Sequence, residues 1–189
     1  YNPIDRNFEK EKNMAKKFTD RYKSRKWRLM RWGQRILLIG AALFFIFQFV
    51  LGISVVNGNS MLNTLQDGDL VLYNRMYKEL KKGDIVSVSL PSGEYYVKRV
   101  VAMAGDSVDI RDGKLYINGE MEEADYVLGE TLSESVSLAY PCTVEEGHVF
   151  VIGDNRPESV DSRYFGTVNV QHITGVLQCR FGLFYLNGL

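Results

Sequence analysis

One uncharged stretch constrains this chain more than any other feature. The 21 residues from Ile36 to Val56 contain no Asp, Glu, Lys, Arg or His. A helix of that length is about 30 Å long, which matches the hydrocarbon core of a bilayer. We therefore predict one transmembrane helix over residues 36–56. It is longer than the apolar region of a secretory signal peptide, and no clear small-residue cleavage site follows it, so we expect it to be retained.

The charges on the two sides of this stretch have opposite signs. Residues 1–35 carry twelve Lys or Arg against four Asp or Glu, whereas residues 36–189 carry eleven against nineteen. By the positive-inside rule, the basic segment 1–35 is expected to stay cytoplasmic and the acidic remainder to be translocated. Lys and Arg alone could also supply nucleic-acid binding, but beside a membrane span anchoring explains them more simply, and no nucleic acid is predicted as a partner.

Residues 57–189 are enough for one extracytoplasmic domain with a hydrophobic core of its own. Only two cysteines, Cys142 and Cys179, are present in the chain. Outside the cytoplasm they could form one disulfide, or they could remain two buried thiols, and their spacing does not decide between these.

The domain has the pattern of short β-strands separated by turn residues. Six segments rich in Val, Ile, Leu and Tyr are predicted strands: residues 69–74, 84–90, 95–103, 107–110, 114–117 and 148–152. Asp112-Gly113 lies between two of them and suits a type I′ hairpin, because both central residues of that turn need positive φ. We predict a mainly β fold with a coiled, antiparallel or barrel-like sheet.

An acidic segment interrupts this pattern at residues 119–147. It carries eight Asp or Glu and only weak periodicity. We expect a surface insertion or small subdomain there.

Ser60 is the first candidate for chemistry, because only residues 57–59 separate it from the predicted span. That spacer reaches at most about 13 Å, so we expect Ser60 close to the membrane surface. A serine nucleophile needs a base. His148 and His172 are candidates for a Ser/His/Asp triad, which is recognised by geometry and not by spacing, although neither has a local catalytic signature.

Lys98 is the second candidate base. In the predicted strand 95–103 its neighbours on the same face are Tyr96, Val100 and Ala102, so this face is apolar apart from the lysine. Desolvation lowers a lysine pKa, which a Ser/Lys dyad requires. The alternative is an edge lysine whose stem packs on the sheet while its amine reaches water. Arg99 points to the opposite face and is interpreted as a structural cation paired with a carboxylate.

A third polar element, residues 153–166, directly follows an apolar strand. It contains two aspartates, two arginines and two serines whose side chains can form a network under a site: Asp154, Asp161, Arg156, Arg163, Ser159 and Ser162. Either serine could hold the lysine amine. The two arginines would repel a cation and no Cys/His spacing fits zinc, so neither a metal nor a cofactor is predicted.

Four motifs in this order, behind one membrane anchor, resemble the bacterial type I signal peptidases, the leader peptidase family with a Ser/Lys dyad. They are Asn59-Ser-Met-Leu-Asn-Thr-Leu65, Gly68-Asp-Leu-Val-Leu-Tyr-Asn-Arg75, Tyr96-Val-Lys-Arg-Val-Val-Ala-Met-Ala-Gly-Asp106 and Gly153-Asp-Asn-Arg-Pro-Glu-Ser-Val-Asp-Ser-Arg163. The resemblance covers about residues 36–172. It implies a coiled antiparallel β domain like that of the self-cleaving SOS repressors, with a small inserted β subdomain over residues 111–147.

The resemblance also implies roles for individual residues. Ser60 matches the nucleophile and Lys98 the general base, a lysine being typical of the bacterial type. Ser159 matches the serine that orients the amine, and Asp161 and Arg163 match a supporting salt bridge. Shallow substrate pockets would be lined by further residues of the four motifs and of the preceding segment: Val56, Met61, Leu65, Tyr96 and Val97.

Two residues depart from the family pattern. Asn63 stands where the family usually has a proline, which loosens the φ of that turn and leaves the placement of Thr64 open. Gly58 stands where some members carry a serine that helps to bind the oxyanion, so we expect an oxyanion hole made by the Ser60 amide and a nearby backbone amide.

The expected function is a membrane-bound serine endopeptidase that removes N-terminal signal peptides from exported preproteins after small, A-x-A-like residues, through an acyl-enzyme. Its expected partners are these signal peptides, membrane lipid and the secretion translocon, in a bacterial cell membrane. One alternative replaces Lys98 by His148 in a triad. The other is a membrane-tethered β domain that binds exported chains without cutting them.

Overall fold

The computed structural model describes residues 3–134 and 138–182 and divides into two units, residues 1–46 and 47–189. The first unit is α1, Pro3–Phe45, and a π-helical turn, Ile46–Val50, continues it into the second. Residues Lys26–Val50 form a helix that is long and apolar enough to cross a bilayer, with a mean hydropathy of 1.8. The single apolar helix predicted from the sequence is therefore present.

The predicted span is wrong at its C-terminal end. Residues Leu51–Val55 are not helical but form strand β1, which pairs with β2, Leu70–Asn74, over five residues. The apolar run thus contains two elements, because a short apolar strand cannot be distinguished from a helical segment by its composition alone. Ser60 lies ten residues beyond the helix and residues 57–59 belong to the β unit, so the expected short tether between membrane and serine is not there.

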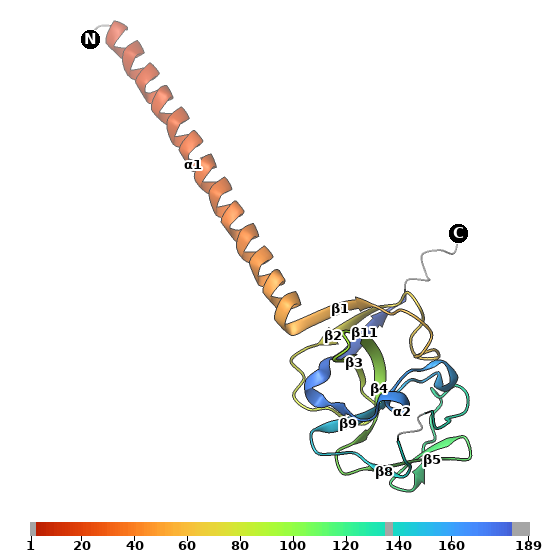
Figure 1. Ribbon diagram of the computed structural model, residues 1–189. Helices are drawn as coiled ribbons and strands as arrows, with labels where there is room; N and C mark the ends of the chain where they lie inside the picture. Colours follow the sequence, from red (N-terminus) through yellow and green to blue (C-terminus); the bar gives the residue numbers. More distant parts are fainter. Residues whose placement is uncertain (1–2, 135–137, 183–189) are drawn as a thin grey trace, which may run out of the picture. The chain divides into compact units, whose positions relative to one another are not determined.

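The second unit is built on one curled antiparallel sheet with strand order β1-β2-β11-β3-β4-β9-β10 (Figure 1). The remaining strands of this sheet are β3 (Ile85–Ser89), β4 (Tyr95–Met103), β9 (His148–Ile152), β10 (Val168–Asn169) and β11 (Ile173–Phe181). The mainly β, coiled antiparallel fold predicted from the sequence is confirmed. β1, β10 and the nine-residue β11 were not predicted.

A second sheet, of order β7-β6-β5-β8, takes the place of the predicted subdomain 111–147. Its strands are β5 (Ser107–Arg111), β6 (Lys114–Ile117), β7 (Glu120–Met121) and β8 (Cys142–Thr143). The predicted boundary is wrong by four residues, because β5 already pairs with β6. The hairpin turn between them is confirmed, since Asp112 and Gly113 have φ of 52° and 71°.

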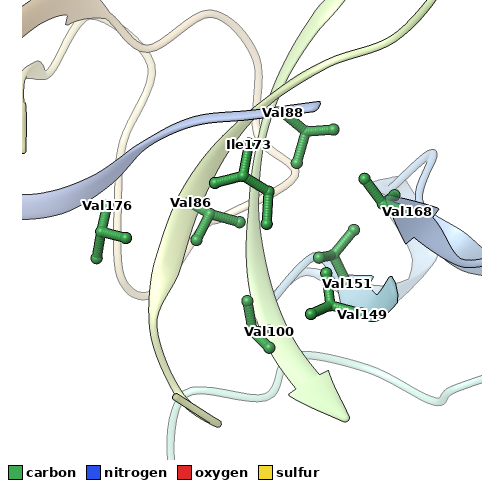
Figure 2. Close-up of a cluster of buried hydrophobic side chains, with 8 residues drawn as sticks. All are labelled: Val86, Val88, Val100, Val149, Val151, Val168, Ile173 and Val176. Carbon is green, nitrogen blue, oxygen red and sulfur yellow. The ribbon is translucent and has the colours of Figure 1, made fainter. Parts of the chain in front are cut away.

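Three buried clusters form the core of the β unit. The first contains seven valines and one isoleucine from β3, β4, β9, β10 and β11, whose side chains point toward one another in Figure 2. The second joins β4 and β9 to the second sheet, so this sheet shares a core with the main one. The third lies under the segment between β1 and β2 and contains Met61 and Leu65.

A β-bulge in β4 connects the first two clusters. Val100 pairs with Val151 and Ala102 with Phe150, so Val101 is an extra residue with no partner on β9. Val100 belongs to the first cluster, whereas Val101 and Ala102 both belong to the second. Because of the bulge, Val100 and Ala102 point to different core clusters, although side chains two residues apart in a regular strand lie on the same face.

The two cysteines lie in different sheets, Cys142 in β8 and Cys179 in β11. Both are free thiols and both are partly exposed. Of the two alternatives open from the sequence, the disulfide is not formed. Burial raises the pKa of the Cys142 thiol.

Candidate active site

Ser60 lies in a compact turn between β1 and β2. The Leu62 amide donates to the Asn59 carbonyl at 3.0 Å, and the Leu65 amide donates to the Met61 carbonyl at 2.8 Å. Met61 and Leu65 are anchored in the third core cluster. The apolar residues of this motif therefore hold the turn down, while Ser60 stays partly exposed at its start.

Lys98 projects from β4 to the Ser60 side chain. Its Nζ lies 2.7 Å from Ser60 Oγ, and the residue is only 1% exposed. Burial lowers the pKa of Lys98 from 10.5 to about 8; Asp161 opposes this shift and Arg163 adds to it. The structure thus places the lysine amine against the serine hydroxyl with a pKa that allows a substantial neutral fraction near neutral pH.

Arg99, the next residue of β4, binds a carboxylate as expected. Its Nε and Nη2 donate to the two carboxylate oxygens of Asp154 at 2.8 and 2.7 Å, a bidentate pair. Thr64 Oγ1 joins this pair by donating to Asp154 Oδ2 at 2.5 Å and accepting from Arg99 Nη2 at 3.1 Å. Thr64 is therefore fixed by the ion pair.

Asp161 and Arg163 form a second buried ion pair. Arg163 Nε donates to Asp161 Oδ1 at 2.9 Å and its Nη2 donates to Oδ2 at 3.0 Å, with both side chains fully buried. Asp161 Oδ2 also accepts from the Gly153 amide at 3.0 Å. The pair therefore supports the loop that follows β9, as the predicted supporting salt bridge requires.

Neither serine of this loop forms a hydrogen bond with the lysine amine. Ser162 Oγ accepts from the Val151 amide at 3.0 Å and so belongs to the end of the sheet. Ser159 Oγ is buried and has no hydrogen-bond partner among the described residues. The expected bond from Ser159 to Lys98 is thus not formed; the hydroxyl packs against Gly153, where an added Cβ would lie 2.2 Å from it and 2.5 Å from the Ser60 carbonyl oxygen.

Asn155 was missed by the sequence reasoning. Its backbone amide donates to the Ser60 carbonyl at 3.0 Å, and its Nδ2 donates to the Asn59 carbonyl at 3.1 Å. Asn155 is buried at 4% exposure. The only sequence signal was its place in a polar motif, since an amide that binds a backbone ninety-five residues earlier leaves no periodic pattern.

A groove of about 420 Å³ runs beside Ser60 and Lys98, a size typical of ligand sites. Four of the predicted substrate-binding residues line it: Val56, Met61, Tyr96 and Val97. Leu65 does not, because it is fully buried in the third core cluster below. Tyr73, Arg75, Ser87, Tyr95 and Thr174, which lie on strands or at their ends, also line the groove and were not predicted.

Gly58 and Asn63 both adopt positive φ, at 88° and 81°. The Gly58 amide donates to Asp67 Oδ1 at 2.7 Å, so it is already engaged. The Ser60 amide has no hydrogen-bond partner among the described residues, which leaves it available to an oxyanion. Asn63 has a conformation that proline cannot adopt, so the departure from the family pattern reflects a different turn and not a looser one.

The two histidines lie elsewhere in the β unit. His148 starts β9 and its Nδ1 lies 3.1 Å from the Glu146 carbonyl oxygen. His172 ends a short 3₁₀ helix, Val170–His172. Within the described residues, the hydroxyl of Ser60 is contacted by Lys98 and by neither histidine.

Comparisons with known proteins identify the family to which the chain belongs. Residues 29–182 match the family model described as signal peptidase, peptidase S26. Signal peptidase IB of Staphylococcus aureus (strain Mu50) is 32% identical over 170 residues, covering 81% of this chain and 89% of the relative. Signal peptidase I T of Bacillus subtilis (strain 168) is 35% identical over 159 residues, 79% of each chain.

Among solved structures, a signal peptidase I from Enterococcus faecalis V583 is 36% identical, with a TM-score of 0.46 over 53% of this chain and 98% of that one. The family model covers most of the chain, and the two curated relatives cover about four fifths of it. The resemblance inferred from the four motifs is therefore confirmed. This chain belongs to the signal peptidase family, peptidase S26, and is a serine peptidase that cleaves signal peptides.

Proposed function

We propose that the chain cleaves exported preproteins through a Ser60/Lys98 dyad and an acyl-enzyme. The observation that carries the proposal is the 2.7 Å contact between Lys98 Nζ and Ser60 Oγ at the edge of the groove. With a pKa of about 8, roughly a tenth of the lysines are neutral at pH 7, compared with roughly one in 3,000 at the ordinary pKa of 10.5. Burial therefore supplies the base that a serine nucleophile needs.

The reaction follows from these two side chains. Neutral Lys98 takes the proton of Ser60 as Oγ attacks the scissile carbonyl carbon, and the Ser60 amide donates to the oxyanion. The resulting ammonium gives its proton to the leaving amine, the C–N bond breaks and an ester to Ser60 remains. Lys98, neutral again, takes a proton from a water that attacks this ester. It then gives this proton to Ser60 Oγ as the ester C–O bond breaks, which releases the signal peptide and restores both the hydroxyl and the neutral amine.

The groove suits an extended peptide with small side chains near the cut. Val56 and Met61 are almost fully buried and line the groove next to Ser60, together with Tyr96 and Val97. We propose that these apolar residues contact the small side chains of A-x-A-like cleavage sites. We expect a Trp substitution at the residue before the cut to abolish processing of a model preprotein.

Three variants test the dyad. Ser60→Ala and Lys98→Ala should each abolish cleavage of a preprotein by the purified chain in detergent, measured by mass spectrometry of the product. Lys98→Arg should also be inactive, because a guanidinium does not deprotonate at neutral pH. Ser92→Ala and Lys114→Ala are matched controls at exposed positions and should remain active. Full activity of Ser60→Ala or Lys98→Ala would overturn the dyad.

The same assay separates the two alternatives. A Ser/His/Asp triad predicts that His148→Ala is inactive while Lys98→Ala still cuts. A domain that only binds exported chains predicts no product from the unaltered protein. The contact of Ser60 with Lys98 favours the dyad over both.

We also propose that α1 crosses the cytoplasmic membrane once, with the basic segment inside, lipid around Ile36–Val50 and the β unit outside near the translocon. The charge difference between residues 1–35 and 36–189 supports this orientation. Protease added to spheroplasts should then remove the β unit and leave a short membrane-bound fragment. Protection of the β unit would contradict the orientation.

A further inference from the structure

The acidic segment between β7 and β8 has a contact that the dyad chemistry does not explain. Glu122 Oε2 binds Arg156 Nη2 at 2.5 Å. Arg156 comes from the polar loop after β9, thirty-four residues away, and is only 1% exposed. A buried guanidinium needs such a partner, because an unpaired charge there would be strongly destabilising. The acidic segment therefore contacts the polar loop after β9, which also contains Asp154 and Asp161.

Arg156 joins several backbone and side-chain groups. Its Nη1 donates to Thr131 Oγ1 at 2.6 Å, and its Nε donates to the Gly153 carbonyl at 3.0 Å. Its own amide donates to the Leu128 carbonyl at 2.9 Å. The guanidinium thus spans from the acidic segment, through Glu122 and Thr131, to the loop that starts at Gly153.

The residue before Arg156 in that loop contacts the backbone of the nucleophile turn. Asn155, directly before Arg156, donates from its amide to the Ser60 carbonyl and from its side chain to the Asn59 carbonyl. These two bonds fix the peptide groups on both sides of the Ser60 Cα. A shift of Asn155 would move the serine hydroxyl relative to Lys98 Nζ, which is held separately by β4.

We propose that Glu122 and Thr131 are positioning residues for Ser60, acting through Arg156 and Asn155. This inference rests on the proposed function of Ser60. The chain of contacts runs from Glu122 and Thr131 to the Arg156 guanidinium, and from the adjoining Asn155 to the nucleophile turn. Displacements of about 1 Å at a reacting group can cost about 100-fold in rate, so a small loosening of this chain is measurable.

The proposal predicts a specific kinetic pattern. Neither Glu122 nor Thr131 lines the groove beside Ser60, so the KM for the preprotein should be unchanged. The charged groups that face Lys98 are Asp161, Arg163 and Asp154. Neither Glu122 nor Thr131 is among them, so the pKa of Lys98, and with it the rise of the cleavage rate with pH, should also be unchanged. Only kcat should fall. A loss through general unfolding would instead reduce the active fraction and the thermal transition together.

The test compares two neighbouring glutamates in the full chain in detergent. Glu122→Ala should lower kcat by about tenfold with KM within about twofold, because the geometry of attack is loosened. Glu122→Gln keeps an oxygen acceptor for the guanidinium and should recover most of the rate. Glu123→Ala, at an exposed position, is the matched control and should match the unaltered protein.

A double-mutant cycle then tests whether Glu122 and Asn155 act on Ser60 through the same series of contacts. Asn155→Ala should also lower kcat by about tenfold, and adding Glu122→Ala should lower it little further, whereas independent effects would multiply to about 100-fold. Multiplying losses, a loss confined to KM, or equal rates for Glu122→Ala and Glu123→Ala would overturn the proposal.

Two further outcomes are distinguishable. If Glu122→Ala does not fold, Thr131→Val, which removes the hydroxyl that accepts from Arg156, should lower kcat and Thr131→Ser should restore it; equal rates for the two would overturn the proposal. If the unaltered protein and Ser60→Ala process the preprotein equally, the proposed function itself fails, and the positioning role fails with it.

Discussion

Lys98 should make the folded protein less stable, and replacing it with Met should show this. Lys98→Met keeps the length of the side chain and removes the buried amine. Lowering the pKa of a lysine from 10.5 to about 8 corresponds to about 3 kcal/mol of destabilisation of the charged folded form. The lost contact with Ser60 offsets about 1 kcal/mol of this. We expect Lys98→Met to be inactive and, at pH 7, more stable by about 2 kcal/mol.

The dependence on pH gives the sign of the effect. Below pH 8 the lysine is protonated in both states, so the folded state bears the full destabilisation. Between about 8 and 10.5 the unfolded lysine binds a proton that the folded lysine does not, so the stability of the unaltered protein rises with pH. The advantage of Lys98→Met should therefore shrink through this window and reverse above it, where the unaltered protein keeps the contact with Ser60 and should be more stable by about 1 kcal/mol.

Urea unfolding of the full chain in detergent, followed by circular dichroism of the β unit, measures this difference. Urea is uncharged, and the other titrating groups are shared by both proteins, so they cancel in the comparison. A variant that gains nothing at pH 7, or that gains equally at pH 7 and pH 10.5, would refute the reasoning that burial is what lowers the pKa of Lys98.

Three other outcomes follow from the site. For the unaltered protein, kcat/KM should rise about tenfold per pH unit up to about pH 8 and then level off, because neutral Lys98 is the base; a profile that is flat from pH 6 to 8 would contradict this role. Gly153→Ala should lower activity and destabilise the fold by about 1–3 kcal/mol, because its Cβ would clash with the Ser159 hydroxyl and the Ser60 carbonyl; a thermal melt and a cleavage assay check both. Asn63→Pro, which restores the usual family residue, should destabilise this chain, whereas Asn63→Gly should be tolerated, since φ is 81° there; a Pro variant with an unchanged melting temperature would show that the turn is not as described.

The parts of the fold with local sequence signals could be predicted. β4, β6 and β9 have the bounds expected from their alternation and from the turn residues beside them. Of the two alternatives left open for Lys98, the structure has the buried lysine, and Arg99 was correctly interpreted as the partner of a carboxylate. These predictions succeed because burial on one face of a strand is recorded with a period of two residues. Ala102 was wrongly expected on the same face as Lys98, because the bulge turns it to the second core cluster.

The elements that were not predicted are of two kinds. Some have a local pattern that fits two different structures, and others depend on contacts between residues far apart in the sequence. β1 lies inside an uncharged run, where an apolar strand and a membrane helix look alike. β11 contains Gly175 and an irregularity between Leu177 and Cys179, which break its alternation. The contact of Glu122 with Arg156 joins two polar segments far apart in the chain, and no spacing rule connects them.

The bulge at Val101 limits which mutations β4 can accept. Lys98, which must reach Ser60, lies three residues before the bulge, and Ala102, which fills the second core, lies one residue after it. Because successive strand residues face opposite sides, a chain shortened by one residue here would turn either the lysine or the core residue to the wrong face. β4 can therefore accept many changes of side chain. An insertion or deletion of one residue within it, however, would cost either the catalytic position of Lys98 or the packing of the second core cluster.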